Sequence, residues 1–138
     1  MADAVTSQTL SDGDRIAVMK FTNISDGTGE SSVAKVDVSA LASNSAGETP
    51  ALATIEQIWY DVGGMRVALE WNATTNVVAA VVGGSAAAGN VSGNMDFRSF
   101  GGIKNTLASG YNGDIDLTTH GHTAHDHYTV VLQLRKSY

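Results

Sequence analysis

The stretch formed by residues 55–71 constrains the fold more than any other part of this sequence. It has the pattern of two β-strands that meet at Gly63-Gly64, and glycine pairs suit a tight hairpin because they accept positive φ at no steric cost. After the glycines, apolar residues alternate with largely polar ones, which is the period of a strand with one buried face. The apolar positions are Met65, Val67, Leu69 and Trp71. The pattern predicts a β-hairpin whose apolar face lies in the core.

Segments of the same kind recur along the chain, and no convincing helix interrupts them. Residues 77–82 form a continuous apolar run, which is typical of a strand buried on both faces. Residues 1–14 are polar and end in turn residues, so we expect an extended N-terminal arm or a short edge strand there. Further strands are predicted at residues 15–23, 32–38, 95–100, 114–119 and 128–136.

The number and spacing of these strands predict the fold class. About eight short strands with connections of very uneven length favour an all-β, two-sheet sandwich of the jelly-roll type. Residues 83–93 and 101–113 are rich in glycine and other small residues, and we interpret them as surface loops suited to docking onto another protein. The length of 138 residues suits one domain, so residues 1–138 are expected to form a single β-sandwich.

The charge balance and the absence of cysteine narrow the function classes. Eight basic residues stand against 14 acidic ones, and the net charge of -6 argues against nucleic-acid binding, which needs a basic face. The longest apolar run is too short to span a membrane as a helix, so no membrane partner is expected. Without cysteine there is neither a disulfide framework nor a thiolate metal site. The first residues lack the basic and apolar regions of a signal peptide, which predicts folding in a cytoplasm.

All four histidines fall in one short segment, and they are the sharpest chemical feature of the chain. His120, His122, His125 and His127 are the only metal-ligand candidates that we single out. Neutral imidazoles suit zinc, copper or nickel, and a His-x-His pair can direct both rings to one side of a strand. No glutamate follows the pair as in a cupin, so a solvated turn is the favoured interpretation, and neither a metal nor another cofactor is predicted.

Other patterns of functional interest have simpler structural interpretations. The acidic segment at residues 26–30 lacks the spacing of a calcium loop and predicts an ordinary surface turn. Neither a Gly-x-Ser-x-Gly elbow nor a phosphate-binding loop is present, so no enzymatic activity is predicted. Trp59, Tyr60 and Trp71 could stack sugars or bases, but large aromatic residues in a hairpin are more often core or interface residues.

Several segments together resemble a known family. They are residues 16–29, 33–39, 55–71, 100–103 and 110–138, and the most telling parts are residues 20–27, 113–115 with Thr118-Thr119, and 134–136. These segments are similar to the capsid cement, or decoration, proteins of podovirus-like tailed bacteriophages. The resemblance spans nearly the whole chain, although the histidine-rich segment at residues 120–127 departs from it.

The resemblance implies a jelly-roll-like sandwich that binds the outer surface of an HK97-type capsid. The implied partners are the phage major capsid protein and further copies of the chain, as a dimer or trimer at a capsid symmetry axis. The implied location is the outer capsid surface of the virion, after synthesis in the cytoplasm of the host bacterium. The family offers no catalytic residue and no required cofactor to transfer.

Two other interpretations remain open from the sequence. The four histidines are compatible with a cupin-like, metal-dependent jelly-roll protein. The β-pattern and the aromatic residues are also compatible with another virion part, such as a tail or head-closure subunit, or with a carbohydrate-binding module.

Overall fold

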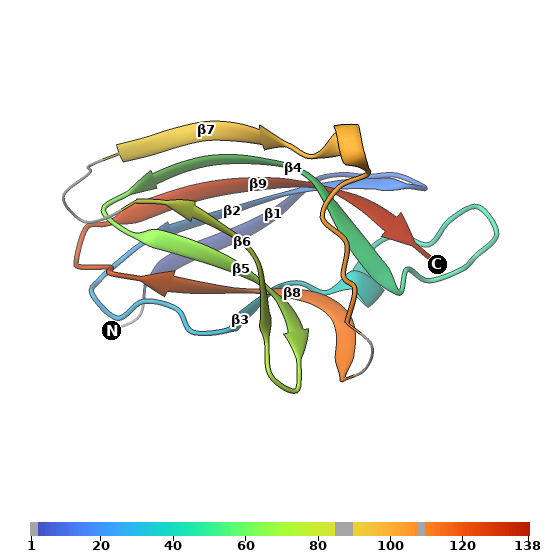
Figure 1. Cartoon of the computed structure of the whole chain (residues 1–138), viewed down its shortest axis with the longest axis horizontal. Helices are drawn as coiled ribbons and strands as arrows, with labels where there is room; N and C mark the ends of the chain where they lie inside the picture. Colours follow the sequence, from blue (N-terminus) through green and yellow to red (C-terminus); the bar gives the residue numbers. More distant parts are fainter. Residues whose placement is uncertain (1–2, 85–89, 108–109) are drawn as a thin grey trace.

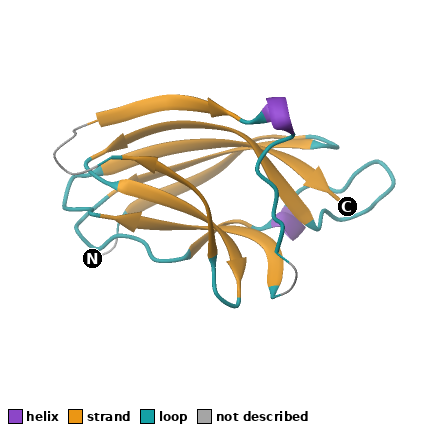
Figure 2. Ribbon diagram, viewed as in Figure 1, coloured by secondary structure: helices purple, strands orange, loops and turns teal. Residues whose placement is uncertain are grey.

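The computed structural model describes residues 3–84, 90–107 and 110–138, and these residues form two antiparallel β-sheets (Figures 1 and 2). Short 3-10 turns at Val38–Ala40 and Arg98–Phe100 are the helical elements of the described part. The strands are β1 (Ala4–Asp12), β2 (Ile16–Ile24), β3 (Val33–Val36), β4 (Leu52–Gly63), β5 (Arg66–Ala73), β6 (Val77–Gly83), β7 (Asn90–Asp96), β8 (Tyr111–His120) and β9 (His127–Ser137).

The strand order is that of a jelly roll. One sheet has the order β1-β2-β9-β4-β7, and the other has the order β3-β8-β5-β6. From β2 to β9 the chain changes sheets at every connection except the one between β5 and β6, so neighbours in a sheet are mostly distant in sequence. The prediction of an all-β, two-sheet sandwich is confirmed.

The predicted hairpin at residues 55–71 is wrong in one respect. Its two strands exist, but β4 pairs with β9 and β7, whereas β5 pairs with β8 and β6. The Gly63-Gly64 turn, with Gly64 at φ 80°, therefore carries the chain from one sheet to the other. Alternation shows which face of a strand is apolar, but it does not show whether consecutive strands lie side by side or face each other.

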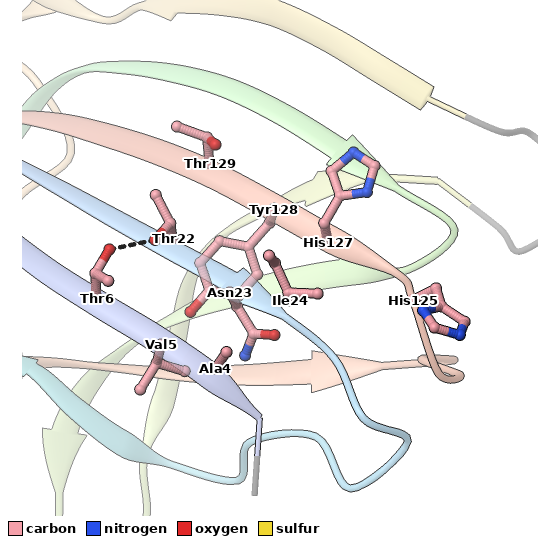
Figure 3. Close-up of a pocket in the computed structure, with 10 residues that line it drawn as sticks. All are labelled: Ala4, Val5, Thr6, Thr22, Asn23, Ile24, His125, His127, Tyr128 and Thr129. Carbon is pink, nitrogen blue, oxygen red and sulfur yellow. Dashed lines mark hydrogen bonds between the residues drawn. The ribbon is translucent and has the colours of Figure 1, made fainter.

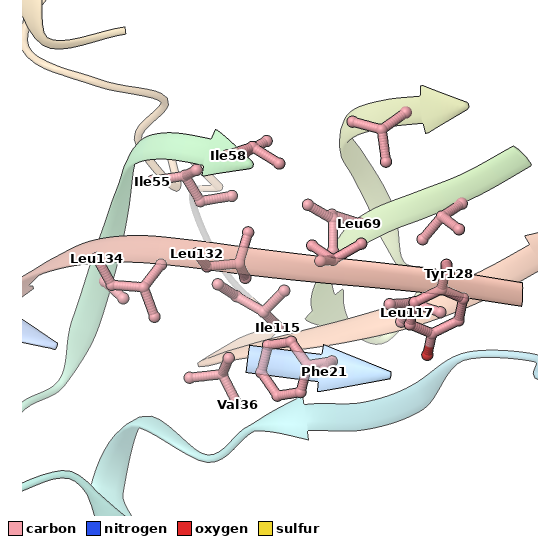
Figure 4. Close-up of a cluster of buried hydrophobic side chains, with 14 of the residues drawn as sticks. Phe21, Val36, Ile55, Ile58, Leu69, Ile115, Leu117, Tyr128, Leu132 and Leu134 are labelled. Carbon is pink, nitrogen blue, oxygen red and sulfur yellow. The ribbon is translucent and has the colours of Figure 1, made fainter. Parts of the chain in front are cut away.

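The inner faces of the two sheets form one hydrophobic core (Figure 4). The predicted apolar face of residues 65–71 is confirmed, since Met65, just before β5, and Val67, Leu69 and Trp71 of β5 are all buried. The central strand β9 alternates strictly, with every second residue from Tyr128 onward buried. The largest fully buried side chains include Phe21, Ile55, Ile58, Leu69, Ile115, Leu117, Tyr128, Leu132 and Leu134.

Three segments differ from their predicted structure. β6 was predicted to be buried on both faces, but it is an edge strand. The prediction failed because a continuous apolar run has the same sequence pattern in both settings. The strand expected at residues 95–100 ends at Asp96, whose carboxylate accepts a hydrogen bond from the Arg98 backbone N–H at 3.0 Å and starts a turn. In the loop expected at residues 83–93, β7 already begins at Asn90, and residues 85–89 lie outside the described residues.

The segment predicted as an N-terminal arm or edge strand is an edge strand. β1 pairs with β2 over most of its length, from Ala4 opposite Ile24 to Asp12 opposite Ala17. The other sheet does not cover it, and eight of its nine residues are exposed. Its polar composition follows from that exposure, because a strand with both faces in water gains little from apolar side chains.

The segment at residues 26–30 is not an ordinary surface turn throughout, because Glu30 is buried. Its Oε2 forms an ion pair with Lys35 Nζ at 2.6 Å, and both side chains are shielded from water. Its Oε1 accepts hydrogen bonds from Tyr128 Oη at 2.6 Å and Asn23 Nδ2 at 2.7 Å. Burial first, and then the Glu30 carboxylate, raise the pKa of Tyr128, so this phenol stays a hydrogen-bond donor. We call these four residues the Glu30 network.

The two tryptophans have different environments, and this gives a test of the core. Trp71 is 4% exposed, whereas Trp59 is 37% exposed. We expect Trp71→Ala to lower the free energy of unfolding by about 3–5 kcal/mol, because it leaves a cavity between the sheets. Trp59→Ala serves as the matched control and should cost less than about 1.5 kcal/mol. Urea unfolding followed by circular dichroism measures both, and equal losses would contradict the assignment of Trp71 to the core.

Candidate interaction surface

The solvent-facing side of the five-stranded sheet carries large apolar side chains that the rest of the molecule does not cover. Alternation turns Thr22 and Ile24 of β2 away from the core, and the same holds for Thr129 and Val131 of β9. Trp59 of β4 is opposite Val131 in the register. Ile24 is 60% exposed. We call Thr22, Ile24, Trp59, Thr129 and Val131 the outer sheet face.

A groove of about 630 Å³ lies at one end of this face (Figure 3). Strands β1, β2 and β9 contribute to it in register, since Thr6 is opposite Thr22 and Thr22 is opposite Thr129. The hydroxyl groups of Thr6 and Thr22 are hydrogen-bonded to each other. The ring of His127 and the loop residue His125 border the opposite end of the groove.

A second depression, of about 260 Å³, adjoins the groove. It is lined by Trp59 and Val131 among others, and it shares Thr129 with the groove. The two hollows therefore form a continuous surface from the end of β2 to the middle of β4. Large aromatic and aliphatic side chains in shallow depressions are the residues that contribute most to protein–protein contacts.

The composition of the groove lining differs from that of the acidic protein as a whole. The groove's lining includes no Asp, Glu, Lys or Arg, while the whole chain has a net charge of -6. Its lining residues are Ala4, Val5, Thr6, Thr22, Asn23, Ile24, His125, His127, Tyr128 and Thr129. Desolvating such a surface costs little, because no charge loses its hydration. The arrangement suits a macromolecular partner better than a charged small molecule.

The structure places the four candidate histidines at the end of β8, at the start of β9 and in the loop between them. His120 and His125 are exposed, and His125 has a left-handed backbone with φ 75°. The ring of His122 is held by Thr119 Oγ1 at Nδ1, 3.3 Å away, and by the Thr28 carbonyl oxygen at Nε2, 3.1 Å away. Both nitrogens of His122 therefore have protein partners.

These positions do not bring the histidines together as a ligand set. Within residues 3–84, 90–107 and 110–138, no group of three or more His, Cys, Asp or Glu side chains is arranged to hold a metal ion. His122 serves to join the β8–β9 loop to the β2–β3 loop, and His125 and His127 border the groove. The cupin-like hypothesis thus has no assembled site in the described part of the chain.

The carboxylate of Asp3 fixes the loop that borders the N-terminal end of β1. Its Oδ1 accepts hydrogen bonds from the backbone N–H groups of Asp26 and Gly29, and its Oδ2 accepts one from Asn23 Nδ2 at 3.0 Å. Partial burial acts to raise the pKa of Asp3, but these hydrogen bonds outweigh it and lower the pKa from 3.8 to about 2. Asp3 therefore connects β1 to the β2–β3 loop beside the groove.

Sequence reasoning did not find most of this surface. Trp59 was among the aromatic residues considered for an interface, and the structure places it on the outer sheet face. Ile24 and the threonines carry no local signal, since a partner strand could have covered them. Asp3 and Glu30 act through contacts with residues far along the chain, which no motif encodes.

Comparisons of the chain with protein-family models, with curated proteins and with solved structures find no match. Among the residues that the structure describes, no helix is long and apolar enough to cross a membrane.

Because hydrogen bonds hold the pKa of Asp3 below its unfolded value, Asp3 should contribute to acid resistance. Its contribution is fully present above the unfolded pKa and is lost as the pH falls from about 4 to about 2. We expect Asp3→Asn to be less stable at neutral pH and to show a shallower loss of stability over this acid range. Urea midpoints measured between about pH 7 and pH 2 test this, with the exposed Asp14→Asn as the control. Parallel pH curves for the wild type and Asp3→Asn would contradict the assignment.

Proposed function

We propose that the chain is a structural virion protein: a cement, or decoration, protein that binds the outer surface of an HK97-type phage capsid. In this role it stabilises contacts between neighbouring major capsid subunits. The observation that carries the proposal is the outer sheet face, which presents Ile24 and Trp59 on a rigid sandwich and includes a groove with no Asp, Glu, Lys or Arg in its lining. The resemblance of residues 16–29, 55–71 and 110–138 to phage cement proteins supports it.

The surface and the rigidity of the molecule meet the physical requirements of a capsid-binding role. A capsid offers many identical sites, so each copy needs only a modest interface, and multivalent attachment increases the total strength. The groove has no Asp, Glu, Lys or Arg in its lining, so a partner seated there does not bury an unpaired ion of these residues. The sheet beneath the surface is fixed by the hydrophobic core, so few groups lose conformational freedom on binding.

The remaining parts of the proposal follow from this role. The partners are the major capsid protein and further copies of the chain at a symmetry axis, and neither nucleic acid nor membrane is a partner. The protein is made in the bacterial cytoplasm, resides on the outer surface of the virion and catalyses no reaction. Neither a cofactor nor a metal is required.

Cosedimentation with capsid shells stripped of the chain tests this function. We expect saturable binding to expanded shells at a fixed ratio to the major capsid subunit, and weaker binding to unexpanded shells. Ile24→Asp should weaken binding at least about tenfold, or ~1.4 kcal/mol, because it places a charge in a desolvated contact. Val33→Asp is the matched control, since Val33 is an exposed valine on the other sheet.

Thermal melts must first show that both variants are folded. Failure of the wild type to bind either form of the shell would contradict the capsid proposal. Equal weakening by Ile24→Asp and Val33→Asp would leave binding in place but would exclude the outer sheet face as the contact.

A further inference from the structure

Strand β6 is an apolar strand at the edge of its sheet. It is the last strand of the four-stranded sheet, and within the described residues it pairs only with β5. Three of its valines remain in water: Val77 is 41% exposed, Val78 54% and Val81 51%. Every residue of the strand is apolar or glycine. An uncharged, β-branched edge of this kind readily pairs with another strand.

The other edges of the two sheets are less suited to pairing. β3 has only four residues, and β1 is made mostly of serine, threonine and glutamine with Asp12 at its end. β7 ends at Asp96, which forms an ion pair with Arg98 at 2.7 Å. Short strands, charges and polar side chains are the usual means by which proteins discourage edge pairing, and β6 has none of them.

The first six residues of β6 have the same sequence in both directions. Residues 77–82 read Val-Val-Ala-Ala-Val-Val, so two copies that run antiparallel place valine opposite valine and alanine opposite alanine. The pairs are Val77 with the second copy's residue 82, Val78 with its residue 81, and Ala79 with its residue 80, each occurring twice. Such self-complementarity is what a two-fold, isologous interface requires.

The faces of the strand agree with this pairing. Val78 is opposite Glu70 and Val81 is opposite Ala68, so both valines lie on the outer face of the sheet. Val77 is opposite Trp71 and Val82 is opposite Val67, so both lie on the inner face. Val78 and Val81 are three residues apart and would face opposite sides of a regular strand. The register shift at Ala79 adds one extra residue between them, so both face the same side. Each pair therefore joins residues of one face.

We propose that β6 pairs antiparallel with β6 of a second copy, so that two four-stranded sheets become one continuous eight-stranded sheet across a two-fold axis. The absence of charge in β6 lets two acidic molecules approach at this edge. The outer sheet face belongs to the other sheet and stays outside the new strand pair. The inference specifies the homo-oligomer named under the proposed function, but it does not depend on capsid binding.

Sedimentation velocity of the full chain at micromolar concentration tests the dimer. We expect a wild-type dimer, and we expect Val78→Lys and Val81→Glu each to raise the dimer dissociation constant at least tenfold. The double variant Val78→Lys/Val81→Glu should restore the dimer, because the proposed register places each lysine opposite a glutamate of the other copy. Val33→Lys on the β3 edge is the matched control and should leave the dimer unchanged, since Val33 is also an exposed edge valine.

Circular dichroism and thermal melting establish that each variant is folded before its mass is interpreted. A monomeric or trimeric wild type would overturn the inference, as would single variants that dimerise like the wild type. A folded double variant that stays monomeric would overturn the proposed register. If Val33→Lys alone abolished the dimer, the interface would lie at the β3 edge instead.

The capsid experiment separates this inference from the proposed function. A β6 dimer that fails to bind shells would leave the inference standing and count against the capsid role. A monomeric protein that binds expanded shells would overturn the β6 dimer and support the capsid role.

Discussion

The buried carboxylate of Glu30 connects the elements on which the rest of the structure depends. Through its side chain it contacts Asn23 of β2, Lys35 of β3 and Tyr128 of β9, and its backbone exchanges hydrogen bonds with Thr119 of β8. One residue thus joins strands of both sheets at the end where the groove opens. A buried charge is stable only while its partners stay in place, and removing one partner of such a pair typically costs about 3–5 kcal/mol. The loops beside the groove are therefore held in place by the Glu30 network, and losing any one of its contacts is costly.

The two solvent-exposed features of the molecule differ in chemistry, and the difference separates their proposed roles. The outer sheet face mixes threonine hydroxyls with isolated large apolar groups such as Ile24 and Trp59, which stay compatible with water in the free protein. The β6 edge is wholly apolar, and among the described strands its backbone pairs only with β5. The outer sheet face therefore suits a contact that the folded protein makes later with a partner. The β6 edge suits a contact between two copies that forms as the chain folds.

The sequence predicted the strands well and their arrangement only in part. Alternation of apolar and polar residues located β5 and β9, because one face of each strand is buried and the other is not. It could not show that β4 and β5 belong to opposite sheets, because facing strands and paired strands have the same pattern. The apolar run at residues 77–82 was expected in the interior, and three exposed valines correct that. The outer sheet face depends on register across β2, β9 and β4, which only the folded chain defines.

The central place of β9 has a consequence for how the chain acquires its shape. β9 is the last of the described strands in sequence, yet β2 pairs with it on one side and β4 on the other. β2 can pair with β1, and β4 with β7, before β9 is made, but these two halves of the five-stranded sheet cannot join until residues 127–137 have left the ribosome. Topologies dominated by distant pairings fold slowly, in about milliseconds to seconds for small domains. In the other sheet, β5 and β6 are the one pair of described strands that follow each other in sequence, so this hairpin can form before β8 and β9 are made.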